Sequence, residues 1–324
     1  MRRWRRALRR LARGDAPALV AATVLLLIAL WLPPLPLTRP TYDVVVIFDV
    51  TQSMNVPDYV LDGRLVSRLD YAKYAIGQAL RRPRCDTRIG WGVFAGRKIV
   101  LLLAPVEVCS NYSALLAALN NVDGRMAFEN ASEVQQGLFW AIDNVQQLQP
   151  VPNLVFMTDG HEAPPLAPDL MRDYDGPKGL VRGWLLGVGD TTPKPIPKTD
   201  IDGNVIGYWH DTEVLQADDA SGHSAEHLSA LHEAGLQRLA KTTGLHYRRL
   251  TGVADADAAI HTPELARPAR IPTDLRAVPA ALALLCLLWP WRPASGWWRD
   301  HLQRLGLRSR RDRKKSRDWN RGFN

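Results

Sequence analysis

Five oxygen-bearing side chains in this sequence have the types and the spacing of a cation-binding site. The stretch YDVVVIFDVTQSMNV places Asp49, Thr51 and Ser53 directly after an apolar run, and LVFMTDG ends a second apolar run at Asp159. Between them, NASEVQQGL places Ser132 at the start of a helical pattern. Ligands of open α/β sheets bind beyond the carboxyl ends of the strands, so these side chains should converge on one crevice.

Two carboxylates and three hydroxyls form a set of hard oxygen ligands that carries few negative charges. Such a set suits an octahedral divalent ion such as Mg²⁺, which keeps several of its waters, and Ca²⁺ and Mn²⁺ remain alternatives. A coordination shell that the chain leaves incomplete can accept a carboxylate from another protein. The residues therefore predict a binding module whose protein partner donates an Asp or a Glu to the metal ion.

Other interpretations of these residues remain open. Ser132 and Gln135 have the S-x-x-Q spacing of a capping box, a role that is compatible with metal binding. Asp159 followed by a glycine also fits a strand-to-turn signal. Ser53 with His161 would form a hydrolase pair, although the chain contains neither a G-x-S-x-G elbow nor a G-x-x-x-x-G-K-[ST] phosphate loop. The last alternative is a structural scaffold with a vestigial metal site.

Alternating strands and helices must position these side chains. Strands are expected at 43–49, 88–95, 98–104, 153–160, 180–190 and 245–250. Helices are expected at 69–80, 112–120, 134–145 and 228–239, the last with a stop at Gly244. This alternation predicts an α/β fold, a doubly wound and mostly parallel sheet with one antiparallel edge strand. Residues 191–226 are too long for an ordinary connection and should form a surface lobe.

The three cysteines predict one disulfide bond. Cys85 precedes the strand at 88–95 and Cys109 follows the strand at 98–104, so an antiparallel hairpin brings them close together. An oxidising compartment would permit the bond, and two separate thiols are the alternative. Cys286 lies in an apolar segment and is expected to be inert.

Charge separates two basic tails from a mildly acidic body. The net charge of +8 divides into +6 in residues 1–16, +8 in residues 292–324 and −6 between them. Residues 16–38 are uncharged and long enough to cross a bilayer, whereas the apolar residues 277–291 number only 15. Arginines beside both segments predict cytoplasmic termini. A cleaved signal peptide is the alternative for the first segment, and a buried or interfacial helix is the alternative for the second.

The expected organisation has five parts. They are a basic tail at 1–15, a transmembrane helix at 16–38, the α/β domain at 39–270, a second transmembrane helix at 275–292 and a basic tail at 293–324. The domain would then lie across the membrane from both tails. The terminal run RSRRDRKKSRDWNR is expected to meet anionic lipid or an acidic partner surface rather than nucleic acid.

The motifs resemble the von Willebrand factor A (VWA) domain and its metal-ion-dependent adhesion site, over residues 42 to about 250. That family has Asp-x-Ser-x-Ser after the first strand, a Thr at the start of a later helix and an Asp that ends the fourth strand. Asp49, Thr51 and Ser53 match the first motif with Thr in place of Ser, Ser132 stands where Thr is usual, and Asp159 supplies the last element. Both replacements keep a hydroxyl, so the resemblance implies a metal-dependent binding protein rather than an enzyme.

Within this family, the flanking apolar segments look like those of bacterial membrane-anchored members found beside MoxR-type AAA+ ATPases. TQSMNVPDY, PVEVC and TDGHEAPPL are similar to members that accompany methanol dehydrogenase maturation, the MxaL type. That resemblance implies an inner-membrane protein whose main domain lies in the periplasm. It also implies a part in assembling a periplasmic enzyme or inserting its metal, with a MoxR-type ATPase as a candidate partner.

Overall fold

The computed structural model describes residues 16–81, 85, 87–166, 171–215 and 225–288. The chain divides into two compact units. One contains residues 1–37 together with 271–324, and the other contains residues 38–270. The second unit holds both of the apolar runs that end in the predicted ligands, Asp49 and Asp159. Everything that positions the predicted metal site therefore belongs to the 38–270 unit.

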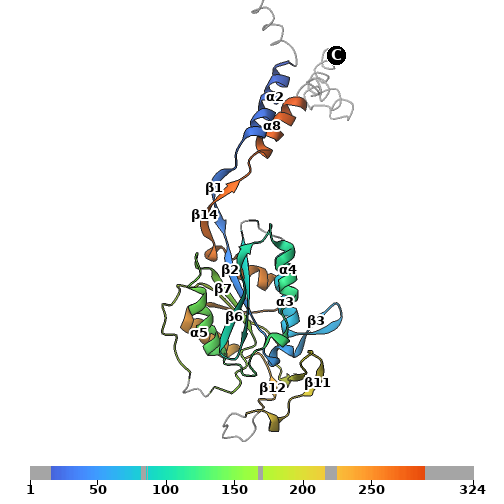
Figure 1. Cartoon of the computed structure of the whole chain (residues 1–324), viewed down its shortest axis with the longest axis vertical. Coiled ribbons are helices and arrows are strands. Elements are labelled where there is room, and N and C mark those ends of the chain that lie inside the picture. The colour runs from blue at the N-terminus through green and yellow to red at the C-terminus, as the bar shows by residue number, and fades with distance from the viewer. Residues whose placement is uncertain (1–15, 82–84, 86, 167–170, 216–224, 289–324) are drawn as a thin grey trace, which may run out of the picture. The chain divides into compact units, whose positions relative to one another are not determined.

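A six-stranded sheet forms the centre of this unit (Figure 1). Its strands are β2 (Asp43–Asp49), β5 (Arg88–Ala95), β6 (Lys98–Glu107), β7 (Asn153–Thr158), β8 (Gly183–Gly187) and β13 (His246–Arg249). They stand in the order β13-β8-β7-β2-β5-β6, and all neighbours are parallel except β5 and β6. The prediction of an α/β fold with a mostly parallel sheet and one antiparallel edge strand is confirmed.

Helices cover both faces of the sheet. On one face lie α3 (Arg68–Ala79), α4 (Tyr112–Asn120) and α7 (Val253–His261), and on the other lie α5 (Val134–Val145) and α6 (Glu233–Thr243). In β2, Val44, Val46 and Phe48 pack toward the first face, and Val45 and Ile47 pack toward the second. Successive strand residues point to opposite faces, so a continuous apolar run is what a strand buried on both sides requires.

The register between β2 and β7 brings the two predicted carboxylates to one edge of the sheet. Phe48 of β2 pairs with Met157 of β7 in a parallel ladder. Each strand therefore ends one residue later at the same edge, where Asp49 is the last residue of β2 and Asp159 directly follows β7. Parallel pairing alone is enough to bring these two positions, 110 residues apart in sequence, into one neighbourhood.

Helix α5 lies close against the sheet because a glycine faces an aromatic ring. A Cβ atom at Gly137 would lie 2.0 Å from Cε2 of Phe94 in β5. The absence of a side chain therefore lets the helix axis approach the strand. Ser132 comes shortly before this helix begins at Val134, so the close packing of α5 also determines where the predicted hydroxyl ligand stands.

The predicted helix at 228–239 begins later in the structure, at Glu233, and ends at Gly244 as expected. Leu228 and the next residue instead form β12 (Leu228–Ser229), which pairs with β9 (Lys194–Pro195). The backbone N–H of His232 donates to the carbonyl of Asp159 at 2.8 Å. This part of the prediction was wrong because main-chain pairing with the lobe and with the strand end holds these residues out of the helix.

Several elements carry weak sequence signals and were not expected. The hairpin of β3 (Pro57–Leu61) and β4 (Arg64–Ser67) turns at Asp62 and Gly63, whose φ angles are 50° and 76°. Asp-Gly is a common pair in such tight turns because both central residues need positive φ. The lobe contains β9 and β12 and a second antiparallel pair, β10 (Pro197–Thr199) with β11 (Val205–Tyr208). Helix α7 was also not predicted.

The other unit contains two apolar helices that lie side by side, α2 (Ala16–Trp31) and α8 (Ala277–Leu288) (Figure 1). Within the described residues, no helix combines the length and the apolar character that a bilayer crossing requires. The expected spans at 16–38 and 275–292 are therefore not confirmed. Pro33 and Pro34 follow the first helix and cannot continue its hydrogen bonds, so residues 35–38 belong to a strand instead.

That strand is β1 (Leu35–Thr41), which pairs with β14 (Arg267–Thr273) in a separate two-stranded sheet. The Thr41 hydroxyl donates to the carbonyl of Arg267 at 3.0 Å, which holds the two segments together where the 38–270 unit begins and ends. The basic tails expected at 1–15 and 293–324 lie outside the described residues.

Candidate metal centre

Asp49 stands at the end of β2 as a fully buried carboxylate. Its Oδ1 accepts hydrogen bonds from the backbone N–H and the hydroxyl of Thr51, at 2.9 and 2.6 Å. Its Oδ2 accepts from the hydroxyl of Thr158, the last residue of β7, at 2.6 Å. The neighbouring strand end therefore orients the carboxylate, and Thr158 is a contributor that the sequence analysis did not identify.

Asp159 follows β7 and is also fully buried. Its Oδ1 accepts from the backbone N–H of His161 at 2.9 Å. Its Oδ2 accepts from Nη1 of Arg68 at 2.5 Å and from the hydroxyl of Ser229 at 3.0 Å. The hydroxyl of Ser53 also helps to lower the pKa of this carboxylate. Donors of the chain itself thus occupy Asp159, and one of them carries a full positive charge.

The two carboxylates lie close enough for the charge of one to act on the other. Burial, and then the negative charge of Asp159, raise the pKa of Asp49 to about 7, although hydrogen bonds from Thr158 and Thr51 lower it. Burial also disfavours the charge of Asp159, but the Arg68 guanidinium and surrounding hydrogen bonds hold its pKa below the ordinary value. Among the described residues, Asp159 has a cationic partner and Asp49 has none.

Thr51, Ser53 and Ser132 line the same cavity, which has a volume of about 360 Å³. Ser53 lies in the short helix η1 (Gln52–Asn55), and its Oγ is 3.3 Å from Oγ1 of Thr51. The hydroxyl of Ser132 is buried and has no hydrogen-bond partner among the described residues. Leaving a buried hydroxyl unpaired costs about 1–3 kcal/mol, so this position calls for a ligand.

Backbone hydrogen bonds hold Ser132 near the strand ends. Its N–H donates to the carbonyl of Ala163 at 2.6 Å, and its carbonyl accepts from the N–H of Ala163 at 2.8 Å. Ser132 also forms an isolated bridge with Gly96, in the turn between β5 and β6. Two separate loops therefore fix the residue before α5 begins, and its side chain does not need to contribute to that fixation.

Ser132 does not cap helix α5, so the capping-box interpretation of Ser132 and Gln135 is wrong. The residue before α5 is Glu133, and no side chain there caps the helix. Instead, the carboxylate of Glu162 accepts from the backbone N–H groups of Val134 and Gln135, at 2.9 and 3.0 Å. Burial is the main cause that raises the pKa of Glu162 to about 7. The Ser132 oxygen is therefore left for another role.

Four of the five predicted donors fit a hard divalent ion. Asp49 supplies a buried charge that lacks a cation, and the hydroxyls of Thr51, Ser53 and Ser132 supply neutral oxygens at one cavity. This is the donor chemistry that Mg²⁺ prefers. Asp159 is the exception, because a carboxylate that pairs with a guanidinium has less charge to offer a metal ion. We therefore regard Asp49 and the hydroxyls as the principal candidate ligands.

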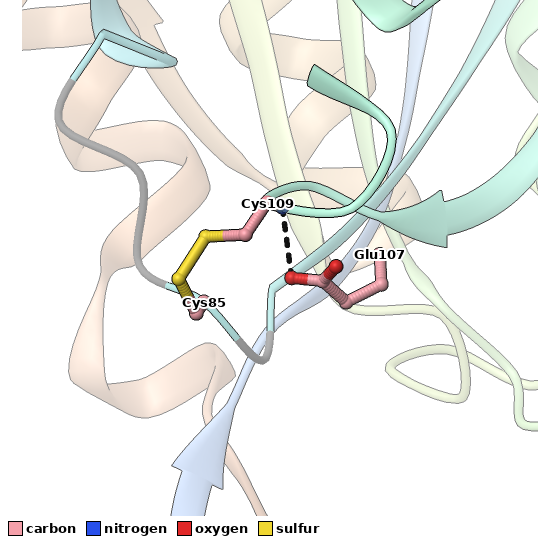
Figure 2. Close-up of side chains that lie close together, drawn as sticks. All are labelled: Cys85, Glu107 and Cys109. Carbon is pink, nitrogen blue, oxygen red and sulfur yellow. Dashed lines mark hydrogen bonds between the residues drawn. A yellow bond between two sulfur atoms is a disulfide. The ribbon is translucent and has the colours of Figure 1, made fainter.

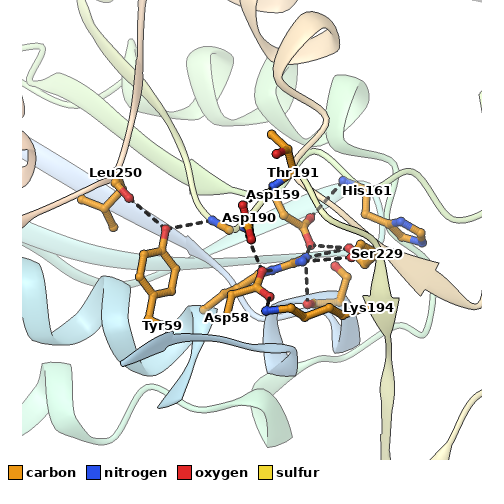
Figure 3. Close-up of polar contacts among 12 residues, drawn as sticks. Asp58, Tyr59, Asp159, His161, Asp190, Thr191, Lys194, Ser229 and Leu250 are labelled. Atoms are coloured by element: carbon orange, nitrogen blue, oxygen red, sulfur yellow. Dashed lines mark hydrogen bonds and ion pairs between the residues drawn. The ribbon is translucent and has the colours of Figure 1, made fainter. Parts of the chain in front are cut away.

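Arg68 is the main residue of this region that sequence reasoning missed. It is the first residue of α3 and is fully buried, with Nε 2.5 Å from Asp58 and Nη1 2.5 Å from Asp159. Asp58 also pairs with Lys194 at 2.9 Å, and Figure 3 shows these carboxylates gathered with Ser229. Nothing in the local sequence signals this burial, because an arginine in the first turn of a helix is ordinarily solvated.

The predicted cysteine pair is a disulfide bond in the structure (Figure 2). Cys85 and Cys109 are joined at an S–S distance of 2.01 Å, and Glu107 accepts from the backbone N–H of Cys109 at 2.8 Å. The bond lies next to the beginning of β5, which is the sheet edge opposite the metal centre. Bonded sulfurs are not thiolates, so these residues do not offer a second metal site. Cys286 in α8 is a free cysteine.

Metal-free protein is expected to lose stability as the pH rises from about 4 to about 7. The folded state holds protons on Asp49 and Glu162, whose pKa values of about 7 exceed the unfolded values near 4. The unfolded state therefore binds fewer protons in this window, and the free energy of unfolding falls as the pH rises. Burial lowers the pKa of His161, which opposes the trend, whereas burial raises the pKa of Asp43 and of Glu226, which adds to it.

Urea unfolding at pH 5 and pH 7.5 in EDTA measures this dependence. We expect the larger free energy of unfolding at pH 5, and a smaller difference between the two pH values for the double variant Asp49→Asn, Glu162→Gln. Equal stability of the wild-type protein at both pH values would contradict the assignment of raised pKa values to these buried carboxyl groups.

Comparison with known proteins gives only structural similarities. No protein-family profile and no curated protein matches this chain. An aerotolerance-related membrane protein from Bacteroides fragilis is 21% identical with a TM-score of 0.47, over 68% of this chain and 96% of that one. A von Willebrand factor type A protein from Catenulispora acidiphila is 11% identical with a TM-score of 0.41, over 75% and 43%. The ArnB paralogue VWA2 from Sulfolobus acidocaldarius is 10% identical with a TM-score of 0.38, over 69% and 45%.

Proposed function

We propose that this chain is a VWA-type binding protein that holds a divalent cation, with Mg²⁺ as the first candidate, and uses it to engage a carboxylate of a partner protein. The observation that carries the proposal is the buried hydroxyl of Ser132, which has no partner among the described residues. It lines the same cavity as Thr51 and Ser53, beside a buried Asp49 whose charge no cation of the described chain neutralises. A cation at this place would satisfy both groups.

The residues of the metal centre would bind the ion from one side and leave its other side open to a partner. Asp49 and the three hydroxyls would bind it from the sheet edge, while Thr158 keeps the Asp49 carboxylate oriented. The ion would supply a positive centre that a partner's Asp or Glu can bind. The cavity above the hydroxyls is lined by Trp209, Ile196 and other lobe residues, which gives a partner side chain room to reach the site.

A narrower role is part of the same proposal. The resemblance of TQSMNVPDY, PVEVC and TDGHEAPPL to the MxaL type suggests assembly or metal insertion of a periplasmic enzyme such as methanol dehydrogenase, with a MoxR-type ATPase as a further partner. The basic tails beside apolar segments favour anchoring in the inner membrane with both termini in the cytoplasm. Neighbouring genes for such an ATPase and for dehydrogenase subunits would support this role, and their absence would count against it.

A hydrolase is the weaker alternative. Within the described part of the chain, no hydrogen bond joins Ser53 to His161, and Nδ1 of His161 has no partner. The Ser53 hydroxyl instead lies 3.3 Å from Oγ1 of Thr51 and helps to lower the pKa of Asp159. A nucleophilic serine needs a base within hydrogen-bond reach, so this geometry favours a ligand serine.

A cation titration of the full-length chain tests the proposed function. We expect Mg²⁺ or Mn²⁺ to stabilise the fold, by about 2.7 kcal/mol when the free ion is 100-fold above its dissociation constant, and EDTA to reverse the effect. Thermal unfolding with MgCl₂, MnCl₂, CaCl₂ or EDTA provides the measurement. If none of the three ions changes the melting temperature, the scaffold interpretation replaces the metal site.

A further inference from the structure

We propose that Arg68 is a built-in counter-ion of the metal centre, which weakens cation binding and keeps the bound ion electrophilic toward an acidic partner. This inference rests on the proposed metal-dependent function. A carboxylate that is already paired with a guanidinium contributes less negative charge to a neighbouring ion. The ion is then held mainly by Asp49 and the hydroxyls, and more of its charge remains for a carboxylate from outside the chain.

The contacts of Arg68 place its guanidinium group within the metal centre. Its Nη1 bonds Oδ2 of Asp159 at 2.5 Å, and the same nitrogen lies 3.3 Å from the carbonyl of Ser53. Two predicted ligands thus share one guanidinium. Nη1 and Nη2 also donate to the hydroxyl and carbonyl of Ser229, at 2.6 and 3.1 Å, and Nε donates to Asp58.

The surroundings of the guanidinium are shaped to hold it. Arg68 is fully buried, and a Cβ atom at Gly189 would lie 2.7 Å from its Nε. Gly189 has a φ of 127°, a conformation that favours glycine, so this backbone and the arginine fit each other. Asp58 is buried on the other side and is itself paired with Lys194. Arg68 and Lys194 together balance the two carboxylates of Asp58 and Asp159, so removing any one of the four alters the charge that the others present.

Arg68 could act on the metal centre through its charge, or it could only support the fold. The two roles predict different effects on cation affinity when Arg68 or Asp58 is substituted. If Arg68 acts through its charge, Arg68→Met makes the metal centre more negative and should tighten cation binding. Asp58→Asn removes the carboxylate that shares the arginine, leaves more positive charge beside Asp159, and should weaken cation binding. If Arg68 only supports the fold, both variants should loosen the site and weaken cation binding alike.

Isothermal titration of the full-length protein with MgCl₂ and MnCl₂ separates these cases. We expect binding about tenfold tighter for Arg68→Met and about tenfold weaker for Asp58→Asn, since one unit charge a few ångströms away acts on a divalent ion. Arg125→Met is the matched control, because Arg125 pairs with Asp123 at an exposed site and should leave the affinity unchanged. Weaker binding in both variants, or unchanged binding in both, overturns the proposal.

The anionic partner provides a second readout. N-acetyl-aspartate serves as a minimal carboxylate probe, and water-proton relaxation of the Mn²⁺-loaded protein follows its binding. We expect Mn²⁺-loaded Arg68→Met to bind this probe several-fold more weakly than the wild-type protein, and equal or tighter binding overturns the electrophilic role. If Arg68→Met does not fold, Lys194→Met takes its place, because it removes a positive charge from the same cluster at the other oxygen of Asp58. The charge role predicts tighter cation binding for Lys194→Met, and weaker or unchanged binding overturns the proposal. A wild-type protein that binds no cation would reject the proposed function itself, a result distinct from those above.

Discussion

Asp49→Asn is expected to lower the affinity of the protein for Mg²⁺ by about 100-fold or more. Asp49 is the buried carboxylate without a cationic partner among the described residues, so it would contribute the strongest single attraction to the ion. Changes in groups that only support a metal ligand already cost about 10–100-fold in affinity, and a direct carboxylate ligand should cost at least as much. Isothermal titration with MgCl₂ measures the loss.

The same substitution should leave the metal-free protein at least as stable as the wild type. Asparagine has the shape of aspartate and can still accept the N–H of Thr51, while the unfavourable charge beside Asp159 disappears. Urea unfolding in EDTA tests this half of the prediction. Asp62→Asn is the control, because Asp62 lies in the exposed β3–β4 turn and asparagine tolerates its positive φ. An Asp49→Asn protein that binds Mg²⁺ as tightly as the wild type would remove Asp49 from the site.

Ser132→Ala is expected to weaken Mg²⁺ binding by about 10–100-fold without destabilising the fold. The Ser132 hydroxyl is buried and unpaired among the described residues, and its backbone bonds to Ala163 do not depend on the side chain. Removing an unsatisfied buried hydroxyl is neutral or raises the free energy of unfolding by up to about 1 kcal/mol. Titration with MgCl₂ and urea unfolding in EDTA measure the two effects on one preparation.

Thr87→Val is the matched control for Ser132→Ala. The hydroxyl of Thr87 is also buried and unpaired in the described structure, but it precedes β5 at the opposite edge of the sheet. Its removal should affect stability in the same direction and leave Mg²⁺ binding unchanged. If Ser132→Ala were destabilising and bound Mg²⁺ normally, the hydroxyl would have a structural partner rather than a metal ion.

The strand ends were predictable because the signal for them is local. The run VVVIF in β2 is apolar at every position, as a strand covered on both faces requires. Parallel neighbours end at the same edge of a sheet, so Asp49 and Asp159 could be placed together from the sequence pattern alone. The disulfide pairing of Cys85 with Cys109 could be inferred for a similar reason, since a hairpin fixes which residues face each other.

The start of α6 and the burial of Arg68 were not predictable because distant segments decide them. Leu228 has helical spacing with the leucines that follow, but β9 pairs with its backbone and draws it into the lobe. Arg68 resembles any solvated arginine in the first turn of a helix until Asp58, Asp159 and Ser229 surround it. Asp159 and Ser229 lie 91 and 161 residues from Arg68 in the chain, so the local sequence around Arg68 does not reveal them.

By itself, the sequence determined the alternation of strands and helices, the sheet edge where polar side chains gather, and the oxygen donors that make a metal site plausible. These features depend on residue type and on periods of two and 3.6 residues, which a linear pattern carries. Only the tertiary structure decided which carboxylate is neutralised by Arg68, that Glu162 rather than Ser132 serves the start of α5, and that Ser132 is left unpaired. The reason is physical: charge pairing and burial depend on distances between groups far apart in the chain, and those distances exist only after folding.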